Sequence, residues 1–374
     1  MRTHLIATLM AALAASPAMA QSWSDRFVDP QDGKFDMSSH LLEHRGFLPV
    51  PLLITEPAVG YGGGAALLFF SESIAESRQR SESAKERFAP PNIGGIAAFK
   101  TENGSQGLGG GYFGTLAGDR YRYLLAAGKA ELNLDIYGLA GKPRRFALDA
   151  PFALAQGLAR IGDSDWLVGA RYLYAGSSAS FAAERPSEIP VRQLESDIGR
   201  ASLLLDYDSR DNMFTPSSGS YLELDVGMAR PGLGSTSSFE NVMLRGHSYL
   251  PLGKSAVLGL RGDGQFSRGD VPFYALPYIK LRGIPAMRYQ GSKVLVAEAE
   301  LRYNLDARWA LVGFAGSGRT DVDNVSFVKA QSASAVGTGF RYLIARKLGL
   351  YAGMDVARGP EETAIYLQVG SAWN

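Results

Sequence analysis

The sequence contains no cysteine, no long apolar run and no excess of charge of either sign. Without cysteine, the 374-residue chain can form neither a disulfide nor a lipid anchor through an N-terminal thiol. Its 38 Lys and Arg nearly balance its 37 Asp and Glu, and a net charge of +1 gives no reason to expect a nucleic-acid partner. Beyond the N-terminus, no apolar stretch approaches the roughly 20 residues of a membrane-spanning helix, so helical spans are excluded.

The N-terminus has the pattern of a cleavable secretory signal. Arg2 and His4 precede an apolar run at 5–13, and residues 16–20 supply a small-x-small cleavage site before Gln21. An N-terminal membrane anchor is the alternative, but the apolar run is too short to span a membrane. We therefore predict a signal peptide at 1–20, a short periplasmic segment at 21–46 and a single large domain at 47–374.

Apolar residues in the large domain are dispersed rather than grouped. The chain has 44 Gly, 17 Tyr and 18 Phe, and many segments alternate apolar and polar residues with a period of two, as in 166–174 and 297–305. One face of such strands suits lipid and the other suits water. The pattern predicts an all-β fold, a transmembrane antiparallel β-barrel of about 16 strands with both termini on the periplasmic side. A soluble β-sandwich is the alternative, with its charges on the outside.

One long connection interrupts this alternation between Gly269 and Gly291. Its second half, 277–291, contains two prolines and two glycines, too many for a strand or a helix to pass through it. It also carries Lys280, Arg282 and Arg288 among large apolar residues, a composition that does not favour disorder. We expect this outer loop to fold back into the lumen, which a barrel of this size would otherwise leave open to water.

Several shorter patterns are given structural interpretations. Asp36 is placed as the N-cap of a short helix ending near Gly46, and the charged run 72–86 is expected to be a solvated periplasmic connection. His40, Glu43 and His44 match an H-x-x-E-H zinc pattern, but the segment has no domain around it. The glycine runs 60–64 and 107–111 open no helix and are not phosphate loops. His247 has no Ser-centred motif beside it, which argues against a lipase.

Two stretches resemble the bacterial surface antigen barrels, the superfamily of BamA and TamA. Residues 206–219 are similar to the Asp/Arg/Asp…Pro…Gly periplasmic turn of that family, with the motif residues Asp206, Asp208, Arg210, Asp211, Pro216 and Gly219. Leu281, Arg282, Gly283 and Ile284 are similar to the Arg-Gly motif that, in that family, tucks the sixth outer loop into the lumen. The resemblance also takes in the strands that carry Glu300 and Arg341, and it implies a barrel without POTRA modules, because 21–46 is too short for one.

The chain departs from that family at two positions of the loop site. Ile284 stands where the family has an aromatic residue, and Gly316 stands where it often has the acid that accepts the loop arginine. A buried guanidinium without a partner is costly. We therefore predict that Arg282 pairs with Glu298 or Glu300, which face the lumen on the next strand; a solvated arginine in an outer loop is the alternative.

The first and last strands are expected to form a weak seam. Pro49 and Pro51 remove backbone donors from the first strand, and Gly370 interrupts a last strand predicted at 364–373. In the resembling family such a seam passes client strands or lipid. We therefore expect a non-enzymatic outer-membrane protein of a Gram-negative bacterium, without metal or cofactor, acting in membrane protein assembly or in translocation of protein or lipid. Its partners would be outer-membrane lipid, client proteins or a separate periplasmic protein docked at 72–86. The alternative is a passive channel or structural surface antigen without clients.

Overall fold

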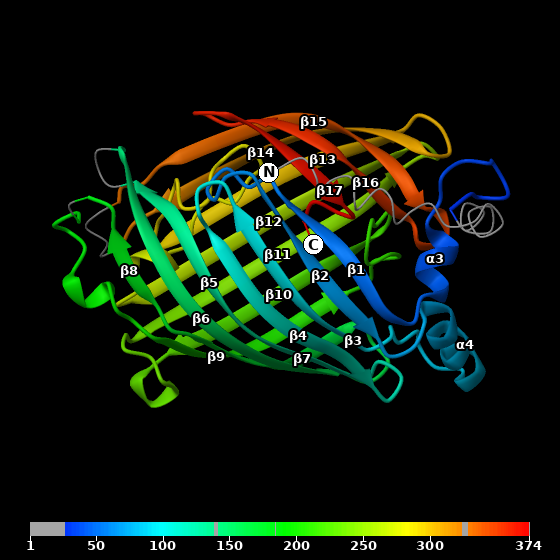
Figure 1. Ribbon diagram of the computed structural model, residues 1–374, viewed down its shortest axis with the longest axis horizontal. Coiled ribbons are helices and arrows are strands. Elements are labelled where there is room, and N and C mark those ends of the chain that lie inside the picture. Colours follow the sequence, from blue (N-terminus) through cyan, green and yellow to red (C-terminus); the bar gives the residue numbers. More distant parts are fainter. Residues whose placement is uncertain (1–26, 138–140, 184, 324–327, 374) are drawn as a thin grey trace, which may run out of the picture.

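The computed structural model describes residues 27–137, 141–183, 185–323 and 328–373, and these residues form one β-barrel (Figure 1). The predicted signal peptide at 1–20 lies outside the described residues. Each wall strand pairs in antiparallel fashion with the next, and neighbouring strands are in continuous register over most of their length. The fold is the predicted all-β barrel, with sixteen strands in its wall and one short extra strand.

The strands of the wall, in order, are β1 (Gly46–Ile54), β2 (Gly62–Phe70), β3 (Ile93–Thr101), β4 (Gln106–Leu116), β5 (Tyr121–Tyr137), β6 (Pro143–Arg160), β7 (Trp166–Ala175), β9 (Ile198–Asp208), β10 (Gly219–Ala229), β11 (Phe239–Leu252), β12 (Ala256–Gly269), β13 (Lys293–Asn304), β14 (Trp309–Asp321), β15 (Ser332–Ala345), β16 (Leu350–Arg358) and β17 (Thr363–Val369). The short β8 (Ser178–Phe181) pairs with the outer part of β6, beyond the end of β7.

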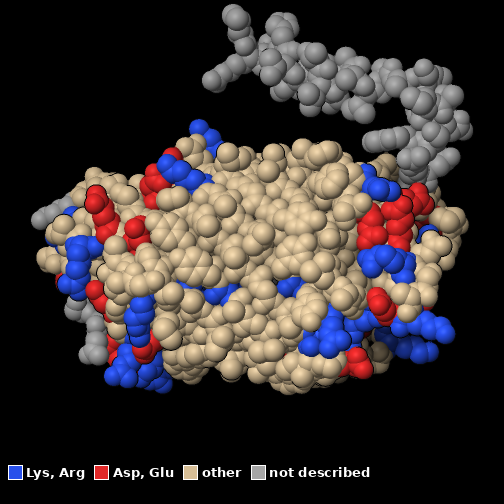
Figure 2. All heavy atoms as spheres, turned by 90° about the horizontal axis from the view of Figure 1, so that it is seen from below, with Lys and Arg blue, Asp and Glu red and all other residues tan. Residues whose placement is uncertain are grey.

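Alternation along the strands separates a lipid face from a lumen face. In β14 the residues Trp309, Leu311 and Ala315 are exposed, whereas Val312 and Phe314 between them are buried. The exposed positions are largely apolar, which is the reverse of a soluble sandwich. Figure 2 shows the result: Lys, Arg, Asp and Glu gather at the two ends of the barrel, and a broad, largely uncharged belt lies between them. The pattern that predicted strands therefore also placed their faces correctly.

The two ends of the barrel are closed by different elements. One end carries the helices α3 (Ser38–Glu43) and α4 (Ile74–Ala84), together with the start of β1 and the end of β17 (Figure 1). We call it the periplasmic end, as the sequence predicts. The opposite, outer end is filled by an apolar cluster of loop and strand residues that includes Ile136, Phe146, Ile189, Phe239 and Phe273. No helix in the described part of the chain is long and apolar enough to cross a membrane.

The periplasmic end differs from the predictions in two details. The charged run 72–86 is a largely exposed connection, as predicted, but residues 74–84 of it form α4, with Ser73 and Glu76 making reciprocal capping bonds at its start. Asp36 does not occupy the N-cap of α3, which is Met37. Asp36 does accept the Ser38 N–H at 2.7 Å, but its other carboxylate oxygen contacts an arginine across the mouth of the barrel. β1 begins at Gly46, one residue before the predicted start of the large domain, and β2 begins at Gly62.

Four short 3₁₀ turns complete the described structure. They are η1 (Val191–Gln193), η2 (Pro231–Leu233), η3 (Phe273–Ala275) and η4 (Arg346–Leu348). The first three lie in outer connections, and η4 lies between β15 and β16 at the periplasmic end. In the long connection between β12 and β13, η3 packs into the outer apolar cluster, so that the second half of this connection starts from a fixed point.

Candidate functional site

Residues 277–291, which we call the lumen loop, form a narrow tongue inside the barrel. Backbone bonds hold its two arms together, from Ile279 to Tyr289 at 3.0 Å and from Gly291 to Pro277 at 3.0 Å. The tongue packs through Ile279, Leu281, Ile284 and Tyr289 against inward residues of β13 and β15, and all four are buried. Ile284, at the position where the resembling family has an aromatic residue, contributes to this apolar contact. The predicted loop into the lumen is therefore present.

The guanidinium of Arg282 lies at the tip of the lumen loop among three carboxylates. It contacts Glu298 at 2.8 Å, Glu300 at 2.7 Å and Asp355 at 2.7 Å. Its side chain is only 10% exposed, and its Cζ lies 3.5 Å from the ring centroid of Phe314. Charge-assisted hydrogen bonds in several directions compensate the desolvation of the cation. The structure thus brings both predicted partners to Arg282 and adds Asp355, which the sequence reasoning missed.

The glycine at position 316 makes room for this arrangement. A Cβ at Gly316 would lie 2.6 Å from Cδ2 of Leu281 and 3.2 Å from Cγ of Glu298. An acid at this position would therefore occupy the space that the loop and Glu298 now fill. The acceptors of Arg282 come from β13 and β16 instead, on either side of the β14 position where the family has its acid.

A second glycine allows the loop tip to approach the wall. Gly283 has φ of +88°, a conformation in which a Cβ is strained. A Cβ there would also lie 2.9 Å from the amide nitrogen of Gly359, in the connection from β16 to β17. The site therefore requires Arg282 for its charge and Gly283 because glycine has no side chain.

The carboxylates around Arg282 are themselves held by other groups. Asp355 also accepts from Arg341 at 2.5 Å, and Glu298 also accepts from Arg261 at 3.1 Å. A Cβ at Gly339 would lie 2.1 Å from an oxygen of Asp355, so the Gly337-x-Gly339-x-Arg341 strand supplies both space and a second cation for this acid. That strand, noted in the sequence, was the available signal for Asp355.

The lumen loop contacts both sides of the seam, which we define as the junction of β1 and β17. On the β17 side, the Gly283 N–H donates to the Tyr366 hydroxyl at 2.9 Å and Arg288 contacts Glu361 at 2.8 Å. On the β1 side, the Ala286 N–H lies 3.4 Å from the carboxylate of Glu56. The loop therefore lies behind the seam, inside the barrel.

The seam is the weakest junction of the described wall. Every other pair of neighbouring wall strands has a backbone ladder, but none joins β1 to β17 in the described residues. Pro49 and Pro51 lie two residues apart in β1, so their missing N–H groups belong to the same edge of the strand. Their side chains face outward, whereas Val50 faces the lumen.

The chain after β17 turns into the lumen, contrary to the prediction of a closing strand at 364–373. β17 ends at Val369, and Gly370 has φ of +80°, which breaks the strand. The Ser371 N–H then donates to the Phe214 carbonyl at 2.6 Å. The buried ring of Trp373 packs against Tyr249 and Val257, and its indole N–H donates to Glu298 at 2.8 Å. We call residues 370–373 the tail.

The motif at 206–219 forms a brace across the periplasmic mouth. Asp206 and Asp208 end β9, Arg210 contacts Asp208 at 2.8 Å, and Asp211 accepts the N–H of Ser217 at 2.9 Å. Gly219, with φ of +92°, begins β10. From this turn, Asn212 donates to the Leu348 carbonyl at 2.7 Å, and Arg302 donates to the Pro216 carbonyl at 3.3 Å. The turn therefore reaches the β15–β16 connection and the tail on the far side of the mouth.

A sixteen-stranded wall with a lipid-facing belt, an arginine-tipped loop in the lumen and one unpaired junction defines a class of protein, the outer-membrane β-barrels with an occluded lumen. Residues 170–346 match the family model of the Omp85 superfamily domain, a range that covers the turn motif, the lumen loop and β13 with Glu298 and Glu300, and ends before β16. Just under half of the chain is thus similar to the Omp85 superfamily domain, and the resemblance to the BamA and TamA barrels is confirmed.

Solved structures with the same fold have little sequence in common with this chain. BamA from Haemophilus ducreyi lacking POTRA domains 1–3 has a TM-score of 0.57 at 11% identity, over 87% of this chain and 69% of the other. CdiB from Escherichia coli has a TM-score of 0.59 at 10% identity, over 86% and 61%. CdiB from Acinetobacter baumannii has a TM-score of 0.56 at 12% identity, over 86% and 59%. The chain therefore spans about three fifths of the CdiB chains. No curated protein matches its sequence.

Proposed function

We propose that this barrel acts in the outer membrane of a Gram-negative bacterium, without enzymatic chemistry, in the assembly of membrane proteins or the translocation of protein or lipid through the seam. The observation that carries the proposal is the missing ladder between β1 and β17. An unpaired backbone group facing lipid costs several kcal/mol, so two open edges are a site where an incoming strand or a lipid lowers the free energy. The Omp85 superfamily domain supports the same function.

The groups around the seam suit a junction that opens. The lumen loop touches both sides of it through single hydrogen bonds and ion pairs rather than through a ladder. The tail, which could otherwise lengthen β17, is held in the lumen by Phe214 and Glu298. Opening of the seam therefore requires few bonds to break, and both of its edge strands, β1 and β17, are short.

A disulfide across the seam tests the proposal. Because the chain lacks cysteine, cysteines replacing Pro51 and Leu367, which both face outward, form the only possible bridge. Val50 and Val369 would be unsuitable for such a bridge, because their side chains face opposite sides of the wall. The barrel in liposomes is given an unfolded eight-stranded outer-membrane barrel, or a fluorescent phospholipid, and insertion or transbilayer movement is timed.

The reduced form of the same double variant is the matched control. We expect the reduced protein to accelerate insertion or lipid movement over empty liposomes, the oxidised protein to lose this acceleration, and a reducing agent to restore it. Equal rates for the oxidised and reduced forms would eliminate the seam as the route.

A passive channel or structural surface antigen is the second candidate. Its lumen would carry mixed charge, from Arg171, Arg200 and Asp263 among others, and so little ion selectivity. The buried tongue of the lumen loop argues against a wide steady pore. In planar bilayers we expect small, irregular openings; large, steady conductance would favour the channel.

Partners follow from the same reading. Outer-membrane lipid would surround the uncharged belt, and client strands would enter at the seam. A separate periplasmic protein, if one acts with the barrel, would dock at α4, whose exposed side chains include both positive and negative charges.

A further inference from the structure

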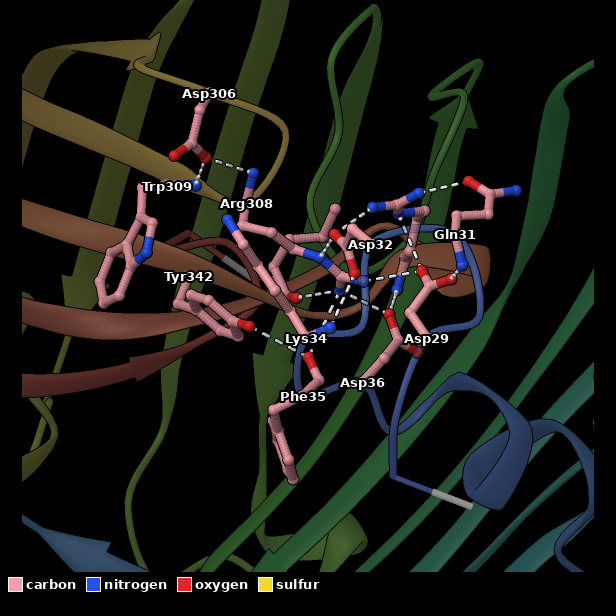
Figure 3. A network of polar contacts seen from close by, with 12 residues as sticks. Asp29, Gln31, Asp32, Lys34, Phe35, Asp36, Asp306, Arg308, Trp309 and Tyr342 are labelled. Atoms are coloured by element: carbon pink, nitrogen blue, oxygen red, sulfur yellow. Dashed lines mark hydrogen bonds and ion pairs between the residues drawn. The ribbon is translucent and has the colours of Figure 1, made fainter. Parts of the chain in front are cut away.

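The residues before β1 form a compact hairpin at the periplasmic end. A bridge pairs Val28 with Phe35, and the Gly33 N–H donates to the Asp29 carbonyl at 2.8 Å. This fold directs Asp29, Asp32 and Asp36 towards one point, although they are spread over eight positions of the sequence (Figure 3).

That point is the guanidinium of Arg308, in the connection between β13 and β14. Its side chain is fully buried, with ion pairs of 2.7 Å to Asp29, 2.7 Å to Asp32 and 2.6 Å to Asp36. Arg346, in η4 between β15 and β16, adds contacts of 3.1 Å to Asp29 and 2.6 Å to Asp32. The hairpin is thus bound to two periplasmic turns at once.

Neutral bonds extend the same contact. The Met37 N–H donates to the Ile344 carbonyl at 2.6 Å, and the Lys347 N–H donates to the Ser38 hydroxyl at 2.9 Å. The Tyr342 hydroxyl donates to the Phe35 carbonyl at 3.1 Å. All these partners belong to β15 or to the turn that follows it, on the β17 side of the seam.

The other end of the segment is attached on the β1 side. Rings form a continuous row with centroid separations of 5.2 Å from Phe27 to His40, 5.5 Å from His40 to His44 and 6.0 Å from His44 to Phe70. Phe70 ends β2 opposite Gly46, the first residue of β1. In Figure 1, α3 lies between α4 and the ends of β15 and β16, and it contacts both α4 and η4.

We propose that residues 27–45 are a strap that bridges the periplasmic end of the seam and holds β1 close to β17. The chain turns inward at Gly370, so β17 makes no ladder with β1 at the periplasmic end. The contacts of the strap take the place of that ladder. The inference rests on the proposed seam but concerns its closure and not what passes through it.

The strap should bind as a unit. Arg308 without its carboxylates would be a buried, uncompensated charge, and the carboxylates without Arg308 would repel one another. Intermediate states are therefore unfavourable, and the strap has two states, docked and released.

Two pairs of spin labels measure these states in the full chain in liposomes. Labels on cysteines replacing Lys34 and Lys347, both exposed, report docking of the strap. Labels replacing Phe47 and Val369, which are 64% and 67% exposed on the lipid face, report the width of the seam. Arg308→Gln removes the cation, Asp32→Asn removes one carboxylate, and Arg319→Gln, an exposed arginine at the opposite end of β14, is the matched control.

In Arg308→Gln we expect the narrow 34–347 distance distribution to be lost and the 47–369 distribution to broaden to longer distances. Asp32→Asn should do the same for part of the population, and Arg319→Gln should match the parent protein. If Arg308→Gln fails to fold, shown by lost heat-modifiable gel mobility, Asp32→Asn decides. A released strap with an unchanged seam distribution would overturn the proposal. Because no client is used, this outcome is independent of the insertion and lipid assays.

Discussion

Trp373 and Arg282 bind the two oxygens of the same carboxylate. The indole N–H of Trp373 donates to Glu298 Oε2 at 2.8 Å, and Arg282 donates to Glu298 Oε1 at 2.8 Å. The tail that follows β17 and the tip of the lumen loop are therefore joined through one side chain of β13. Release of the loop tip leaves Glu298 Oε1 without its donor, whereas release of the tail leaves Oε2 with its remaining bond from Arg261. The shared carboxylate therefore couples the two segments.

Truncating Trp373 should destabilise the tail in two separable steps. Trp373→Phe keeps most of the ring and removes the donor, and we expect a loss of about 1 kcal/mol. Trp373→Ala also empties the space against Tyr249 and Val257, and we expect about 3–5 kcal/mol. Urea unfolding in lipid vesicles measures both. Equal losses for the two variants would show that packing contributes nothing.

Removing the loop arginine should release the lumen loop. Arg282→Met leaves Glu298, Glu300 and Asp355 close together without their shared cation, and breaking a buried ion pair in this way costs about 3–5 kcal/mol. Protease accessibility of the loop and heat-modifiable gel mobility report the change. Arg282→Lys should be intermediate, because an ammonium lacks the planar fork that reaches several acceptors.

The exposed Arg319 on β14 is the control for this substitution. Arg319→Met should leave loop accessibility and gel mobility at parent values. If Arg282→Met matched it, the three ion pairs would have no role in holding the loop.

Gly316 should tolerate no side chain while the loop is docked. In Gly316→Ala the new Cβ would lie 2.6 Å from Cδ2 of Leu281, and overpacking of this kind costs about 1–3 kcal/mol. Gly313→Ala, on the same strand with no atom within 4 Å of the new Cβ, should be nearly neutral. Leu281→Ala should relieve the Gly316→Ala defect, and a double-mutant cycle measures this coupling. Additive losses would contradict the contact.

The wall of the barrel could be predicted because one physical rule repeats along it. Each strand must present apolar side chains to lipid and can present polar side chains to the lumen. Each strand therefore alternates apolar and polar residues with a period of two. The Arg282 site was partly predictable for a related reason. Glu298 and Glu300 lie on the strand that follows the loop, at alternate positions whose side chains face the lumen. Asp355 lies on β16, which is separated from the loop by β13, β14 and β15.

The tail and the strap could not be predicted, because each depends on contacts distant in the sequence. The alternation of β17 continues plausibly to Trp373, and only the backbone conformation at Gly370 directs the chain inward. Arg308 is one arginine in a short turn, and its three carboxylates precede it by more than 270 positions. The hairpin that brings the three carboxylates together is irregular. Their spacing in the sequence therefore follows no helical or strand period that could have identified the cluster.

Acid should release the strap, because the docked state lowers the pKa of two of its carboxylates. The hydrogen bond from Arg308 holds the pKa of Asp32 well below its ordinary value. Burial tends to raise the pKa of Asp36, but hydrogen bonds from Ser38, Arg346 and Arg308 together lower it. Arg308 and Arg346 face this cluster as cations, Asp29 and Asp306 face it as further acids, and Lys34 donates its backbone N–H to Asp32.

A folded pKa below the unfolded value of about 3.9 means that the docked strap binds fewer protons than the released one. Its stabilisation is therefore complete at higher pH and is lost as the pH falls through the folded pKa. The 34–347 spin-label distance should be unchanged from pH 7 to pH 5 and should broaden only below about pH 4. Asp32→Asn should weaken docking at pH 7 and flatten this acid transition. Release between pH 7 and pH 5 would contradict the assignment of the switch to Asp32 and Asp36.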